Sequence, residues 1–267
     1  MAPAVWRSEV AVVSAVGNDV VDLRDSDSDA TTHPRRFDER VFSPAERTMI
    51  RESAGSAESG GSDGTTRLRW RLWAGKEAAF KAARKLDAAT VFSPRRFEVE
   101  FSGAHAGRVT HRRKGGAVEC FELAWWHDDD AVHAVAKHEG TSPPEASAQL
   151  IHSFRRLEPK EAAECESGST GCGPSWGPSR AVRTFAREQL SRALDVPVKA
   201  LDIRSHGRVP TLWRDSRLAR ADLSLSHHGE WIAFACWLDA SELSDGPRRR
   251  AGRSAGRSLA DGRSPLP

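Results

Sequence analysis

Two stretches of this sequence share one rhythm of apolar and polar residues, and each follows a segment with helical spacing. Residues 119–137 alternate around the polar break HDDD, and residues 221–238 alternate around SHHGE. Alternation with a period of two on both sides of a short polar break predicts a pair of antiparallel strands. We therefore expect an α+β fold of two similar, pseudo-twofold subdomains, each a helix packed on a small antiparallel sheet.

The other regular segments support this duplicated arrangement. Apolar residues at helical spacing predict amphipathic helices over 67–86 and 180–194. A β-branched apolar run predicts a first strand at 10–16 that leads into GNDVVDL, and shorter strands are expected at 97–101 and 200–203. Each half then has the order helix, followed by strands.

Three segments rich in glycine and serine separate or extend these halves. Residues 53–66 are expected to form a flexible insert, 164–179 a linker and 245–267 a disordered basic tail, because none has apolar residues to bury. The first half then occupies 1–163 and the second 180–244. A basic tail could bind nucleic acid, but a solubilising end is the favoured interpretation.

Composition excludes several classes of protein. No apolar run approaches the roughly 20 residues that a membrane-spanning helix needs, and the N-terminus lacks a signal-peptide pattern. The four cysteines are scattered without metal-ligand spacing, which indicates free thiols. We expect a cytoplasmic protein with no membrane partner. The net charge of +3 is too small to indicate nucleic-acid binding by itself.

Three charged residues are candidates for metal or phosphate chemistry. Asp19 follows Gly17 at the end of the predicted first strand, where it either faces a cleft or satisfies the amides of a turn. Glu77 and Lys81 lie one turn apart on the predicted helix. They form either an ordinary exposed ion pair or a metal-binding carboxylate beside a phosphate-binding lysine.

A further group of candidates lies in the second half, where Ser226 and His227 end a predicted strand. Both side chains can bind phosphate oxygens, and Arg208, which follows Gly207 in the segment GRVP, offers a guanidinium for the same purpose. A serine hydrolase is disfavoured because the chain has no GxSxG elbow. A zinc site at His227 and His228 is disfavoured because neighbouring strand residues point to opposite faces.

Taken together, these motifs resemble the 4'-phosphopantetheinyl transferase superfamily. GNDVVDL, RFDERVFSPAE and WAGKEAAFK follow one another in the family's order. RTFAREQLSRAL, LDIRSHGRVPTL and DLSLSHHGEW resemble the N-terminal half of the two-domain Sfp-type enzymes. That half precedes the other in Sfp-type enzymes and follows it here, so the chain resembles a permuted enzyme or an AcpS-like unit with an extension.

The resemblance implies an activity and its partners. The protein would transfer 4'-phosphopantetheine from coenzyme A to a serine of an apo acyl or peptidyl carrier protein, releasing adenosine 3',5'-bisphosphate. Such carriers serve fatty-acid, polyketide and nonribosomal peptide synthesis. The reaction would depend on Mg²⁺ or Mn²⁺, and the active site would lie in the cleft between the halves of a monomer.

The resemblance also assigns roles to individual residues. Asp19 and Glu77 match the metal-binding carboxylates. Asp22 stands where AcpS-type enzymes carry a further acid and is a third candidate for the metal site, directly or through water. Glu77, directly or through a metal-bound water, is the hypothetical base that deprotonates the serine. The residues that match the coenzyme A site are Lys81, Arg192, Gly207, Arg208, Ser226 and His227.

Departures from the family pattern leave two alternatives open. Val21 occupies the position of the third carboxylate of Sfp-type enzymes, and the GRVP turn has one residue more than the usual G-K-P. The chain could be a non-catalytic protein that binds coenzyme A, although the matching residues Asp19, Glu77 and Lys81 argue against this. It could also be a nucleic-acid-associated protein, although the basic tail has no aromatic residue for stacking on bases.

Overall fold

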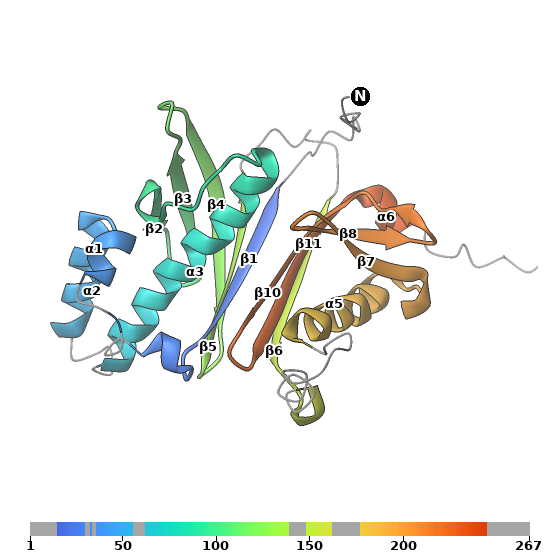
Figure 1. The fold of residues 1–267 in the computed structure, drawn as a ribbon, viewed down its shortest axis with the longest axis horizontal. Coiled ribbons are helices and arrows are strands. Elements are labelled where there is room, and N and C mark those ends of the chain that lie inside the picture. The colour runs from blue at the N-terminus through green and yellow to red at the C-terminus, as the bar shows by residue number, and fades with distance from the viewer. Residues whose placement is uncertain are drawn as a thin grey trace, which may run out of the picture.

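The computed structural model describes residues 15–29, 33, 36–55, 62–138, 148–161 and 177–244. Its strands form three antiparallel sheets, ordered β1-β5-β4-β3-β2, β10-β11-β6 and β7-β8-β9. Figure 1 shows α3 lying along the first sheet and α5 lying against the second. The expected α+β fold, with a helix packed on an antiparallel sheet in each half, is confirmed.

The first half contains β1 (Val16–Asp22), η1 (Ser26–Ser28), α1 (Phe37–Val41), α2 (Pro44–Gly55), α3 (Ser62–Leu86), η3 (Pro94–Arg96), β2 (Phe97–Phe101), β3 (Ala106–Arg112), β4 (Val118–His127) and β5 (Ala131–His138). The second half contains β6 (Gln149–Arg156), α5 (Pro178–Leu194), η5 (Val198–Ala200), β7 (Leu201–His206), β8 (Val209–Arg214), β9 (Arg217–Leu218), β10 (Ala221–His228), β11 (Trp231–Leu238) and α6 (Ala240–Ser244). None of the helices in these described ranges is long and apolar enough to cross a membrane.

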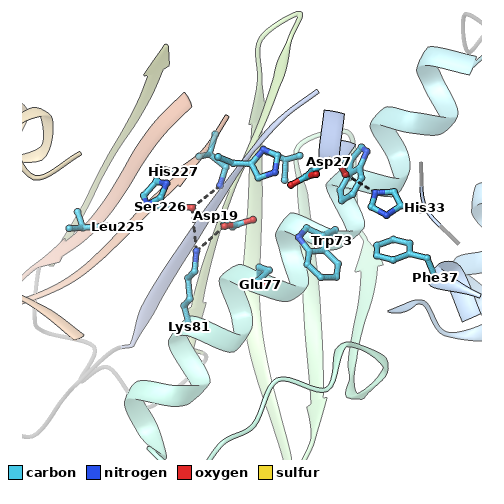
Figure 2. A pocket seen from close by; sticks show the side chains of 14 residues that line it. Asp19, Asp27, His33, Phe37, Trp73, Glu77, Lys81, Leu225, Ser226 and His227 are labelled. Carbon is cyan, nitrogen blue, oxygen red and sulfur yellow. Dashed lines mark hydrogen bonds and ion pairs between the residues drawn. The ribbon is translucent and has the colours of Figure 1, made fainter. Parts of the chain in front are cut away.

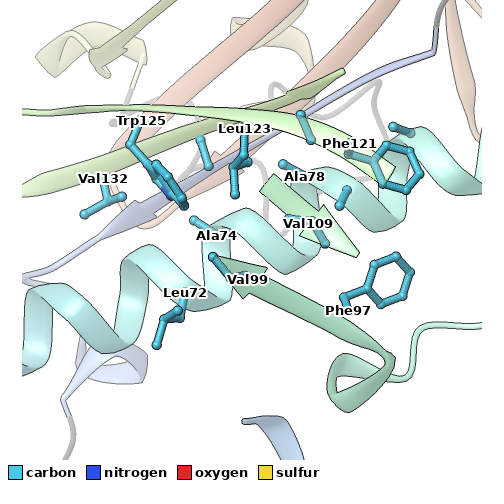
Figure 3. Close-up of a cluster of buried hydrophobic side chains, with 14 of the residues drawn as sticks. Leu72, Ala74, Ala78, Phe97, Val99, Val109, Phe121, Leu123, Trp125 and Val132 are labelled. Carbon is cyan, nitrogen blue, oxygen red and sulfur yellow. The ribbon is translucent and has the colours of Figure 1, made fainter. Parts of the chain in front are cut away.

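The core of the first half is formed where α3 packs on the five-stranded sheet. Ala74 and Ala78 of α3 face Leu123 and Trp125 of β4, as Figure 3 shows, and all four side chains are buried. Burial of this kind contributes about 25 cal/mol for each square ångström of apolar surface removed from water. Small residues on α3 let its axis come close to the sheet.

The contact between α3 and β1 is a backbone contact. A Cβ atom placed on Gly17 would lie 1.9 Å from the carbonyl oxygen of Ala78 and 2.7 Å from the amide nitrogen of Ala82. Because these obstacles are main-chain atoms, a side chain at position 17 would push the strand and the helix apart. The close approach that the alanines of this helix predict is therefore present at β1.

The segment RVFSPAE forms the N-terminal end of α2. The amide of Ser43 donates to the Glu46 carboxylate, and the amide of Glu46 donates to the Ser43 hydroxyl, which is a capping box. Glu46 also lies 2.8 Å from the buried ammonium of Lys76, whose pKa is lowered by burial. This motif residue and the lysine of KEAAFK therefore tie α2 to α3.

The second half has a separate core beneath α5. Val182, Phe185 and Leu190 of α5 are buried against Leu223 of β10 and Phe234 of β11. Phe185 and Phe234 meet edge to face with their ring centroids 5.6 Å apart. Each half therefore buries its own apolar cluster.

The two halves meet along β1 and β10 through four bonds to side chains, which we call the side-chain ladder. Alternate backbone amides of β1 donate to alternate side chains of β10, always 206 positions away. The pairs are Val16 with Asp222, Asn18 with Ser224, Val20 with Ser226, and Asp22 with His228. The constant offset means that the two strands run in the same direction, so the ladder joins the sheets at a fixed register.

Several boundaries differ from the sequence prediction. The first strand is β1 itself, so the strand continues past Asp19 to Asp22, and residues 10–14 lie outside the described part. A further strand, β3, was not predicted, because its buried positions are held by Val109 and a histidine, His111, rather than by an apolar run. His111 is stacked on Phe97 with centroids 4.1 Å apart.

The domain limits also differ. β6 pairs with β11, so residues 149–156 belong to the second half and not to a first half ending at 163. The expected insert 53–66 is helical at both ends, because α2 continues to Gly55 and α3 starts at Ser62. Helical hydrogen bonding extends into these polar residues from the adjoining helices. The remaining insert residues, most of the linker 164–179 and the tail 245–267 lie outside the described residues.

Candidate active site

A cleft of about 480 Å³ lies where β1, α3 and β10 come together. Figure 2 shows Lys81, Asp19 and Ser226 on one side of this cleft and aromatic side chains on the other. The lining residues that matter for chemistry are Asp19, Glu77, Lys81, Ser226 and His227. The structure thus brings together five of the nine predicted site residues from both halves of the chain.

Asp19 is held at the centre of this group. It lies on the same face of β1 as Gly17, the face that packs on α3, and is 7% exposed. Its Oδ1 atom accepts hydrogen bonds from Lys81 Nζ and from Ser226 Oγ, both at 2.8 Å. The carboxylate is therefore fixed from two sides, one in each half of the protein.

Lys81 uses its ammonium to join three groups. Nζ donates to the Asn18 carbonyl at 3.0 Å, to Asp19 at 2.8 Å and to the Ser226 hydroxyl at 3.3 Å. These contacts match the three donors of a lysine ammonium. The side chain remains 29% exposed, so its positive charge faces the cleft.

Glu77 precedes Lys81 by one helical turn and lies beside Asp19. Burial, followed by the nearby negative charge of Asp19, raises the pKa of Glu77 to about 7, although Lys81 opposes the shift. Two neighbouring carboxylates that repel each other are suited to a shared cation. Mg²⁺ commonly takes one or two carboxylates and fills its remaining positions with phosphate oxygens and water.

The pair is not completed by further acidic or histidine ligands. Among the described residues, no group of three or more histidine, cysteine, aspartate or glutamate side chains is placed to hold a metal ion. A cation at this site would therefore depend on Asp19, Glu77 and oxygens supplied by substrate or water. This arrangement suits an ion that acts together with a phosphate substrate.

Asp22 is placed differently from its predicted metal role. Its carboxylate accepts from the amide of Arg24 at 2.9 Å and from the amide of Glu230 at 3.0 Å. It is 3% exposed and faces the turn between β10 and β11, where a Cβ on Gly229 would lie 2.4 Å from it. Asp22 therefore closes that turn against the end of β1 and does not line the cleft.

His227 brings the start of α5 toward the cleft. Its Nε2 atom lies 3.5 Å from the hydroxyl of Ser179 in the first turn of that helix. Burial, and then the charge of Lys81, lowers the pKa of His227, so the ring is mainly neutral at pH 7. A neutral imidazole can still donate one hydrogen bond to an anion.

The predicted coenzyme A residues Arg192, Gly207 and Arg208 do not line the cleft. Arg192 is exposed in the last turn of α5, about 20 Å along the helix from Ser179 at 1.5 Å per residue. Gly207 has a φ of 61° and forms the turn between β7 and β8, next to exposed Arg208. Nearer the start of α5, Arg183 donates to the Ser179 carbonyl at 2.9 Å.

An aromatic wall was missed by the sequence prediction. His33 is stacked on Phe37 with centroids 4.3 Å apart, and Trp70 and Trp73 complete the group. Phe37 and Trp73 lie within the segments RFDERVF and WAGKEAAFK, so their place in motifs was the available signal. In Figure 2 this wall stands opposite Lys81 and Ser226.

A comparison with protein-family models agrees with the motifs of the first half. A family model described as the 4'-phosphopantetheinyl transferase superfamily matches residues 15–136, which include Asp19, Glu77 and Lys81. Among solved structures, the Chronobacterium ammoniagenes ACPS–CoA complex is similar at 23% identity and a TM-score of 0.38, covering 48% of this chain and 98% of that chain. No curated protein matches the chain. Residues 15–136 therefore match the 4'-phosphopantetheinyl transferase superfamily, and over those residues the resemblance predicted from the motifs is confirmed.

Proposed function

We propose that this protein is a 4'-phosphopantetheinyl transferase that modifies a serine of an apo acyl or peptidyl carrier protein, with coenzyme A as the donor. The observation that carries the proposal is the grouping of Asp19, Glu77 and Lys81 in one cleft. The cleft is completed by Ser226 and His227 of the chain's own second half. We therefore propose that the protein works as a monomer.

The proposed reaction needs charge stabilisation. The carrier serine attacks the β-phosphorus of coenzyme A, and adenosine 3',5'-bisphosphate leaves while negative charge builds on the pyrophosphate oxygens. A Mg²⁺ ion held by Asp19 and Glu77 would neutralise part of this charge. Lys81 faces the same space and can move its ammonium from Asp19 to a phosphate oxygen.

Glu77 is the proposed base for the carrier serine. Without a cation its pKa is about 7, mainly because of burial. A bound Mg²⁺ would favour the ionised carboxylate, which is the form that can accept the serine proton. The carboxylate lies one turn from Lys81, so a serine approaching the phosphate would pass close to it. Glu77 would accept the serine proton at its carboxylate, directly or through a water.

The start of α5 supports binding of a phosphate group near His227. The helix begins with no side-chain cap at Gly177, and its N-terminal end carries partial positive charge that favours anions. Arg183 lies in the second turn of this helix. We propose that Arg183 and His227, rather than Arg192, contact the phosphates of coenzyme A on this side.

Intact-mass spectrometry of an apo acyl carrier protein tests the proposal. With the protein, coenzyme A and Mg²⁺, the carrier is expected to gain one phosphopantetheine. EDTA or Asp19→Ala should abolish the gain, because each removes the cation from the cleft. Asp202→Ala is a matched control, since Asp202 is half-exposed on β7, outside the cleft, and forms an ion pair with Arg204.

Two results would contradict the proposal. If apo acyl and peptidyl carriers all stay unmodified while the protein binds coenzyme A, it is a non-catalytic coenzyme A-binding protein. If Asp19→Ala retains full transfer, the carboxylate pair does not hold the reaction's cation.

A further inference from the structure

Ser226 is bonded on every side within the protein. It lies on β10, is 5% exposed and is the third rung of the side-chain ladder. Its hydroxyl donates to Asp19 Oδ1 at 2.8 Å and accepts from the Val20 amide and from Lys81 Nζ, each at 3.3 Å. Of these contacts, the bond to Asp19 is the shortest.

These three bonds use the full capacity of the hydroxyl. A serine hydroxyl has one donor and two acceptor positions, and all three are filled here. A phosphate oxygen is an acceptor, so it would need the proton that Ser226 already gives to Asp19. Moving that proton would leave the 7% exposed carboxylate with one donor fewer on Oδ1, which is costly for a buried charge.

We infer that Ser226 is a positioning residue, which fixes the Asp19 carboxylate for the cation instead of binding coenzyme A phosphates. The inference rests on the proposed function, because the cation and its phosphate substrate belong to that reaction. With Oδ1 held by Ser226 and Lys81, the plane of the carboxylate is set and Oδ2 is the oxygen left to bind the cation.

The two donors to Oδ1 differ in mobility. Lys81 has a long side chain that is 29% exposed and can leave Asp19 when a phosphate arrives. Ser226 has a short side chain on a buried strand, and its Oγ is anchored by Val20 of β1. Ser226 therefore keeps Asp19 oriented during the step in which Lys81 is engaged with substrate.

The neighbouring rung offers a matched control. Ser224 lies two residues earlier on β10, is 3% exposed and accepts from the Asn18 amide at 2.9 Å. It has the same structural role as Ser226 in the ladder, but Asp19 and Lys81 form their hydrogen bonds with Ser226. Ser224→Ala therefore removes a rung and leaves the Asp19 contacts in place.

Binding measurements on the full chain separate the roles. Mn²⁺ affinity is measured by electron paramagnetic resonance, and coenzyme A affinity by calorimetry in EDTA. Ser226→Ala is expected to weaken Mn²⁺ binding about 10-fold, as is typical when a residue that orients a metal ligand is lost. Its coenzyme A affinity, and both affinities of Ser224→Ala, should stay within about twofold of the parent protein.

Three outcomes would overturn the inference. Ser226→Ala that loses coenzyme A affinity in EDTA but keeps Mn²⁺ affinity would make Ser226 a phosphate ligand. Equal loss of Mn²⁺ affinity in both variants would make it a structural rung. A parent protein that binds no Mn²⁺ would remove the need for positioning.

Ser226→Cys, which keeps the shape of the side chain and weakens its hydrogen-bond donor, is measured alongside in case the alanine variant unfolds.

These outcomes are independent of turnover. A parent protein that binds Mn²⁺ and coenzyme A with the expected pattern but modifies no carrier would refute the proposed transferase activity and leave the positioning role of Ser226 standing.

Discussion

At the scale of single residues, the cleft depends on two carboxylates that differ in how they are held. Asp19 accepts two hydrogen bonds on one oxygen, from an ammonium and a hydroxyl. Glu77 is buried beside it, and burial disfavours its charged form, which raises its pKa to about 7. Asp19 is therefore held in place by its hydrogen bonds, while Glu77 gains or loses a proton near neutral pH.

The raised pKa of Glu77 makes the stability of the metal-free protein depend on pH. In the unfolded chain a glutamate titrates near pH 4.3, so below that pH the group is protonated in both states. As the pH rises toward 7, the folded state must ionise a group that it prefers neutral, and the stabilisation present at low pH is lost. In EDTA at pH 8, the free energy of unfolding of Glu77→Gln should therefore exceed that of the parent protein by about 1–3 kcal/mol.

Urea unfolding at pH 5 and pH 8 checks this prediction. The gain should largely disappear at pH 5, and Glu100→Gln, at an exposed position on β2, should show no such gain. A Glu77→Gln protein that is less stable than the parent at pH 8 would show that the charge is compensated.

At the scale of elements, the site is built by pressing β1 against α3. Gly17 allows the two backbones to touch, and this contact places Asp19 of the strand opposite Glu77 and Lys81 of the helix. The capping box and the Glu46–Lys76 pair fix α2 on α3 through the residue directly before Glu77. The motifs around the site are therefore largely packing devices that hold three chemical groups in place.

Gly17→Ala should destabilise the protein strongly. The added methyl group would meet main-chain atoms of Ala78 and Ala82, which cannot rotate away, so the loss is expected at about 3 kcal/mol, the upper part of the range for overpacking. Gly103→Ala is the control, because a Cβ there meets no atom within 4 Å. Thermal unfolding compares the two, and similar melting temperatures would mean that β1 shifts without cost.

At the scale of the whole molecule, two separate cores are joined along β1 and β10. The side-chain ladder is continued by Lys85, whose ammonium donates to both Asp222 oxygens at 2.8 and 2.9 Å and to the carbonyls of Val16 and Leu223. The Lys85 side chain is 8% exposed and that of Asp222 16%. The position of the second half on the first therefore depends on a mostly buried polar seam.

Asp222→Ala should weaken this junction. It leaves the Lys85 ammonium buried without its carboxylate, and removing one partner of a buried pair typically costs about 3–5 kcal/mol. Urea unfolding measures the loss, and the double variant Asp222→Ala/Lys85→Met should recover part of it because no charge remains buried. A loss below about 1 kcal/mol would place the pair among ordinary surface ion pairs.

The sequence alone determined the helices over 67–86 and 180–194, the hairpins that end each half, and the placement of Glu77 one helical turn before Lys81. Each depends on residues close together in the chain, whose periodicity reports which face is buried. Asp19 was a candidate from its place at the end of the predicted first strand, and the resemblance assigned it a metal-binding role. The structure places it against both Glu77 and Lys81.

Only the tertiary structure decided how the halves meet. The ladder joins residues 206 positions apart, and local periodicity carries no information about such a contact. The same long-range packing turned Asp22 toward the β10–β11 turn, brought the start of α5 and not its Arg192 end toward the cleft, and placed β6 in the second sheet. The roles of these residues depend on which surfaces come together, because a side chain's neighbours across an interface are set by the fold and not by the segment that carries it.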